Sequence, residues 1–69
     1  MDNYLVIRSR VGTLALNYGS DHTKCNDDYL TLEMAGAEVI MLGADSLGTL
    51  KTTHSGWFLR GPTTERRVT

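Results

Sequence analysis

Three residues that can bind a metal ion or react covalently lie close together in the first half of the chain. His22 and Cys25 have a His-x-x-Cys spacing, and Asp21 precedes them. A structural zinc site needs four ligands, and the other histidine, His54, is far away in the sequence. The residues around Cys25 offer no context that would activate its thiol for nucleophilic catalysis. The sequence therefore predicts no metal site, no cofactor and no enzymatic activity.

Two polar segments are better candidates for contacting a small ligand. The segment GADSLG, residues 43–48, is bracketed by glycines, and the backbone amides of such a loop can form an anion-binding concavity. It lacks the lysine and hydroxyl residue that complete a P-loop. A second polar loop, GSDHTK, covers residues 19–24, and Trp57 offers an aromatic wall. Ordinary turns between strands are the alternative interpretation of both loops.

Basic and aromatic residues are interleaved in a way that would suit single-stranded RNA. The basic residues on or next to predicted strands are Arg8, Arg10, Lys51 and Arg60, and the aromatic residues that could stack on bases are Tyr4, Tyr18, Trp57 and Phe58. The chain has seven Lys and Arg and eight Asp and Glu. This nearly balanced charge argues against a protein that coats a whole phosphate backbone. Solvated strand faces and core aromatics are the alternative interpretation.

The length of 69 residues predicts a single small domain. Such a domain buries only about 60% of its unfolded surface, and oligomerisation commonly adds stability at this size. The single cysteine excludes a disulfide within the chain and fits a reducing compartment. The chain has no apolar run near the roughly 18 residues of a membrane span and no signal-peptide pattern at its start. We therefore expect a cytoplasmic protein that does not bind membranes.

Alternating residues predict a β-hairpin with strands at 4–10 and 13–18, turning near Val11 and Gly12. Residues 19–28 read as a polar loop. Two more strands are expected at 49–53 and 57–60, around a turn at 54–56. Pro62 would close the last strand. The predicted domain is therefore 1–61, followed by a flexible tail at 62–69.

The segment 29–43 fits two structures. As strands, Leu30, Leu32 and Met34 alternate with polar residues, residues 35–36 turn, and 38–42 return. As a helix, Asn26 caps the start, Gly43 ends it, and an apolar stripe lies along one side. We expect a mostly β fold, a small antiparallel sheet or barrel-like domain assembled into a homo-oligomer. The alternative is an α+β fold of ββαββ order with a helix at about 27–42.

Several predicted strands are apolar on both faces. In the first strand Leu5 and Ile7 point one way, and Tyr4 and Val6 point the other. In the last strand Trp57 would oppose Phe58. An antiparallel sheet with one solvated face should alternate apolar and polar residues instead. We therefore expect a second subunit to cover the other face; the alternative is one helix over one face, with a few apolar residues exposed.

Four segments, NYLVIRS, GSDHTK, AEVIML and GTLKTTHSGWFL, resemble the tryptophan RNA-binding attenuation protein family over residues 3–60. The resemblance implies a ring-shaped homo-oligomer of sheets that binds tryptophan between subunits and RNA on its rim. It places Thr23 in the ligand loop, Asp45 and Ser46 at ligand contacts, and Lys51 at an RNA contact. The sequence departs from the family at the second rim position, where Thr53 replaces a basic residue.

Together these observations suggest a non-enzymatic, homo-oligomeric regulatory protein. It would hold an amino-acid-like or nucleotide-like ligand, or single-stranded RNA, at subunit edges. The expected ligand-binding residues are Thr23, Asp45, Ser46 and Trp57, and the expected nucleic-acid-binding residues are Arg8, Arg10 and Lys51. The alternative is a small phage-type inhibitor or sequestering protein that blocks a host defence component by binding a protein or a signal molecule. It would dock on a protein through its apolar second face and the acidic loop that contains Asp27 and Asp28.

Overall fold

The structure is a computed structural model that describes residues 1–68. Its elements, in chain order, are β1 (Asp2–Arg8), β2 (Thr13–Asn17), α1 (His22–Met34), β3 (Glu38–Ala44), α2 (Leu47–Thr53), the 3-10 helix η1 (Ser55–Phe58) and β4 (Thr63–Arg67). The strands form one sheet in the order β3-β1-β2-β4. Because β4 runs parallel to β2 and the other pairs are antiparallel, the sheet is mixed. The fold is therefore α+β, and the expectation of a mostly β antiparallel domain fits only in part.

The predicted hairpin is confirmed as β1 and β2. Tyr4 pairs with Asn17 and Arg8 with Thr13, and the chain turns through Val11 and Gly12 as the sequence predicts. β3 pairs along the other edge of β1, so β1 lies between two strands. β1 is apolar on both faces because residues of α1 pack on one of them and residues of α2 and η1 on the other.

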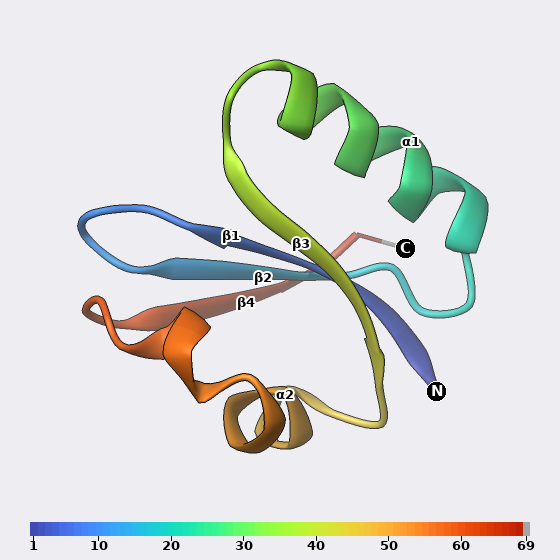
Figure 1. The fold of residues 1–69 in the computed structure, drawn as a ribbon. Coiled ribbons are helices and arrows are strands. Elements are labelled where there is room, and N and C mark those ends of the chain that lie inside the picture. The colour runs from blue at the N-terminus through green and yellow to red at the C-terminus, as the bar shows by residue number, and fades with distance from the viewer. Residues whose placement is uncertain (69) are drawn as a thin grey trace.

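The chain's own helices lie against both faces of the sheet (Figure 1). On one face α1 inserts Cys25 into a core with Leu5 and Tyr18. On the other, α2 and η1 pack on a core that includes Tyr4, Val6, Ala15, Ala44 and Leu50. Each face thus has a helical layer of the same chain against it, although α1 packs mainly on β3 and β1. The expectation that a second subunit covers one face stays a prediction.

Helix α1 forms because both of its ends are capped, which corrects the predicted loop at 19–28. The Asp21 side chain accepts a hydrogen bond from the Lys24 amide at 3.0 Å. At the other end Gly36 has a φ of +88°, which a glycine adopts without strain. The Gly36 amide donates to the Glu33 carbonyl and the Ala37 amide to the Leu32 carbonyl, each at 3.0 Å, the pattern of a Schellman motif. Segment 29–43 is consequently helix in its first part and strand in its second.

The strands predicted at 49–53 and 57–60 are wrong, because residues 47–58 are helical. The Ser46 side chain accepts from the Thr49 amide at 3.3 Å and starts α2. Leu50 then points into the core, where it is 1% exposed. Trp57 and Phe58 do not oppose each other; both pack against the same core cluster. Burial of these apolar side chains outweighs the strand preference of the threonines.

Residues 63–67 form β4 and not part of a flexible tail; Thr69 lies outside the described residues. Two glycines allow β4 to approach the hairpin. A Cβ added at Gly61, whose φ is +76°, would lie 2.5 Å from the Val11 carbonyl oxygen, and one added at Gly12 would lie 2.5 Å from that of Pro62. The Thr13 amide donates to the Pro62 carbonyl at 3.0 Å. This contact places β4 beside β2, so Pro62 begins a strand where the sequence suggested that it ends one.

Candidate functional site

Helix α1 covers only part of its face of the sheet. It packs on β3 and β1, whereas β2 and β4 lie beyond it. Leu16 belongs to the α1-side core, and Leu14 shares its face because strand residues alternate. Their partners across the parallel pair are Thr64 and Arg66, both exposed. The result is an apolar strip along β2, with a polar strand edge on one side.

A groove of about 450 Å³ occupies the hairpin end of this strip. Its lining is more apolar than polar and consists of Ile7, Ser9, Val11, Gly12, Thr13, Leu14, Pro62, Thr64 and Arg66. A smaller hollow of about 250 Å³ lies between α1 and the sheet and shares Ile7 with the groove; it is also lined by Leu16, Tyr18, Asp28, Thr31 and Leu32. Both hollows therefore lie along β2, the larger one over Leu14 and the smaller one over Leu16.

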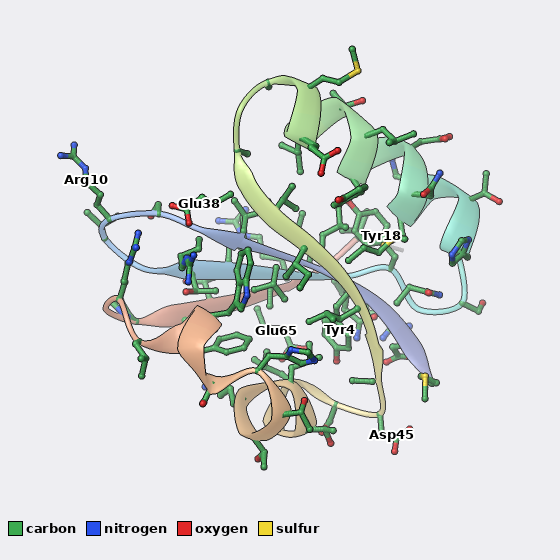
Figure 2. The ribbon with its side chains drawn as sticks, in the orientation of Figure 1. Tyr4, Arg10, Tyr18, Glu38, Asp45 and Glu65 are labelled. Atoms are coloured by element: carbon green, nitrogen blue, oxygen red, sulfur yellow. The ribbon has the colours of Figure 1, made fainter. Side chains whose placement is uncertain are left out.

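The charge of the larger groove is positive. Arg66 is exposed on its rim, and no carboxylate is among the described residues that line it. Arg10 extends from the hairpin turn into solvent at the same end of the molecule (Figure 2). The carboxylate of the smaller hollow, Asp28, accepts a hydrogen bond from the Tyr18 hydroxyl at 2.7 Å. This bond holds the pKa of Asp28 below its usual value. The groove is thus suited to an apolar group that carries a negative charge.

Two of the predicted site residues, Arg8 and Trp57, are in direct contact on the opposite face. The Arg8 guanidinium lies 4.4 Å from the centre of the Trp57 ring and donates to the Glu38 carboxylate at 2.6 Å. Arg60 reaches the same carboxylate at 3.5 Å. The hydrogen bond from Arg8 is the main reason that the pKa of Glu38 is lowered. Arg8 is therefore engaged within the fold and fixes η1 to the end of β1.

The other predicted residues are dispersed. Thr23 lies in the first turn of α1, and Ser46 caps α2. Asp45 points away from the domain at the end of β3 (Figure 2). Arg10 lies in the hairpin turn and Lys51 on α2, and both are exposed. Among the described residues, Arg8 with Trp57 is the one pair of predicted site residues joined by an ion pair, a ring contact or a side-chain hydrogen bond.

The residues that form the groove were missed by the sequence interpretation, because Thr64 and Arg66 were assigned to the tail. One signal was present. The segment TTERR combines β-branched threonines with charged residues, a composition typical of an edge strand that must avoid aggregation. Leu14 was identified as a strand residue, but its exposure beside α1 depends on how far the helix extends.

Residues 1–68 contain no candidate metal-binding cluster and no candidate membrane-spanning helix. No group of three or more His, Cys, Asp and Glu in this part of the chain could hold a metal ion. No helix within the same range is long and apolar enough to cross a bilayer.

No family model, no curated protein and no solved structure matches this chain. The resemblance to the tryptophan RNA-binding attenuation protein family consequently has no support beyond the residues that suggested it.

Proposed function

We propose that this chain is a non-enzymatic binding module that holds a segment of another protein in the groove over β2. The segment would carry apolar side chains together with carboxylates. The observation that supports this proposal most directly is the lining of the groove, in which Ile7, Leu14 and Pro62 form apolar walls and Arg66 supplies an uncompensated charge. By binding such a segment of its partner, this chain would act as an inhibitor or sequestering protein.

The state of Cys25 supports a non-enzymatic role. Cys25 lies on α1 with its side chain fully buried against the core of Leu5 and Tyr18, and burial raises the pKa of the thiol. A buried protonated thiol is a poor nucleophile and a poor metal ligand. A buried reduced cysteine also agrees with the proposed cytoplasmic location.

The homo-oligomer with a small ligand or RNA at its edges stays a prediction. One argument for it was that Trp57 and Phe58 would lie on opposite faces of a strand, but both rings pack on the same core of their own chain. The aromatic groups that would stack on bases are thus occupied within the fold. For this reason we favour the protein segment over RNA as the occupant of the groove.

The proposal can be tested by titrating the protein with a defined probe while recording amide proton–nitrogen NMR spectra. A suitable probe is the peptide acetyl-Thr-Glu-Thr-Leu-Thr-Glu-Thr-amide, which combines one apolar side chain with two carboxylates. The matched control peptide has lysine in place of glutamate. We expect the acidic peptide to shift the amides of Ile7, Leu14 and Arg66, and the basic peptide to leave them unchanged.

Two charge-reversal variants locate the interaction. Arg66→Glu should weaken binding of the acidic peptide at least about tenfold, because a charge-assisted hydrogen bond is replaced by repulsion. Lys51→Glu carries the same charge change on α2, on the other face, and should bind as the unmodified protein does. If neither peptide perturbs the groove, or if oligouridylate binds instead and Lys51→Glu abolishes that binding, the proposal is wrong.

A further inference from the structure

The outer edge of β4 is unpaired within the described chain. β4 is the last strand of the sheet order, and β2 is its neighbour on one side. It bonds to β2 through Pro62, whose carbonyl accepts from the Thr13 amide at 3.0 Å, and through Val68, whose amide donates to the Asn17 carbonyl at 2.9 Å. In a parallel pair every second residue directs its backbone groups to the partner. Thr63 and Glu65 therefore direct their N–H and C=O groups away from β2.

This unpaired edge and the groove lie on the same strand. Thr64 and Arg66 line the groove, while the backbone groups of Thr63 and Glu65 face outward. A strand added to β4 would lie about 4.8 Å away. Its side chains on the α1 face would stand opposite Thr64 and Arg66. Thr64 is small, so an apolar side chain opposite it can extend toward Pro62 and Leu14.

We propose that the bound segment joins the sheet as an additional strand on β4; this inference rests on the proposed function. The segment presents an apolar residue opposite Thr64 and a carboxylate two positions away, opposite Arg66. Backbone hydrogen bonds to Thr63 and Glu65 supply affinity, and the two side chains supply specificity. The recognised pattern is therefore an apolar residue and an acidic residue separated by one residue, in an extended conformation.

A second copy of the same chain fits this edge less well than an acidic segment does. In a two-fold antiparallel pairing of β4 with itself, one residue near the middle of the strand stands opposite its own copy. That residue would be Glu65 or Arg66. Like charges directly opposite each other are destabilising in a sheet. The edge is thus better matched by a segment that places its carboxylate opposite Arg66.

Two methylated forms of the probe peptide test strand addition. One carries N-methyl groups on the two threonines that flank leucine, and the other carries them on both glutamates. In an added strand, amides of one set face β4 and those of the other face solvent. We expect one methylated peptide to bind about tenfold more weakly and the other to bind like the parent peptide. If both methylated peptides bind like the parent peptide, or if neither of them binds, strand addition is excluded.

A matched pair of variants tests the same edge from the protein side. Glu65→Pro removes an outward amide at an edge position where proline is tolerated, and Glu65→Gln keeps that amide. We expect Glu65→Pro to weaken peptide binding about tenfold and Glu65→Gln to leave it unchanged. Unchanged amide NMR signals of β1 and β2 would show that both variants are folded. Amide exchange provides a second measurement, since the Thr63 and Glu65 amides should become protected when the parent peptide binds.

The outcomes separate the two proposals. The acidic peptide could bind the groove with an affinity that neither N-methylation nor Glu65→Pro changes. That result would overturn strand addition and leave the proposed function standing. No binding of the parent peptide would overturn both. A protein that sedimented as a dimer, with Glu65→Pro sedimenting as a monomer, would assign the edge to a second copy of the chain and overturn the acidic-segment proposal.

Discussion

At the scale of single residues, one buried hydroxyl joins a helix to the end of the hairpin. The Tyr18 ring is buried on the α1 side, and its hydroxyl donates to Asp28 at 2.7 Å. Burial and this hydrogen bond raise the pKa of Tyr18, while the same bond lowers the pKa of Asp28. Lys24 adds an ion pair to Asp28 at 3.4 Å. The carboxylate therefore links α1 to the end of the hairpin.

Replacing Tyr18 by phenylalanine should lower stability in a pH-dependent way. The pKa of Asp28 is lower in the folded protein than in the unfolded chain, where it is about 3.9. The bond therefore stabilises the fold above that pH, and its contribution is lost as the pH falls through the lower folded-state value. At neutral pH we expect the free energy of unfolding to fall by about 1 kcal/mol. This is a small value for a hydrogen bond to a charged acceptor, because Asp28 is accessible to solvent.

Urea unfolding of the native protein and of Tyr18→Phe, at neutral pH and near pH 3, measures this difference. The difference in the free energy of unfolding between the native protein and Tyr18→Phe should be smaller at the lower pH, because Asp28 becomes protonated in the unfolded chain. Tyr29→Phe is a matched control on the same helix, because Tyr29 donates to Glu33 between two solvent-accessible groups. An equal effect of both substitutions at both pH values would contradict the assignment.

At the scale of elements, short polar caps decide where helices begin. Ser46 was expected to contact a ligand, but its hydroxyl accepts from the Thr49 amide and starts α2. Helix α2 has seven residues, too few to be stable in isolation. Its cap and the burial of Leu50 must together hold it on the sheet.

Ser46→Ala should therefore destabilise the protein by about 1 kcal/mol, the typical cost of losing an N-cap. The neighbouring substitution Asp45→Ala is a suitable control, because Asp45 is exposed and points away from the domain. Thermal unfolding followed by circular dichroism compares the two variants. A larger loss from Asp45→Ala than from Ser46→Ala would show that the cap is not what initiates α2.

At the scale of the whole molecule, two small cores share one sheet. Leu5 and Tyr4 are adjacent in β1 and belong to opposite cores, so β1 couples α1 to α2. Damage to either core must weaken the strand on which the other core depends. The domain should consequently unfold as one cooperative unit.

Variants on either face test this coupling. Leu50→Ala, in the α2-side core, should cost about 2–5 kcal/mol. Leu32→Ala, on the α1 side and only half-buried, should cost less. In both, the transition followed by Trp57 fluorescence should coincide with that followed by helical circular dichroism. Separate transitions for the two probes would indicate that the faces unfold independently.

Local sequence patterns predicted the hairpin of β1 and β2, because alternation and glycine act over a few residues. These patterns left open whether residues 29–43 form a helix or two strands, and the structure has the end of α1, a turn at Gly36 and then β3. The sequence also indicated that the strands are apolar on both faces.

Only the tertiary structure decided what covers those faces and where the binding groove lies. Residues 47–58 have comparable preferences for strand and helix, and burial of Leu50, Trp57 and Phe58 against the sheet selects the helix. Residues 63–67 become a strand because the glycine contact at the hairpin places them beside β2. Arg66 becomes a groove residue only through that pairing. Long-range packing outweighs the weak local preferences of such short segments.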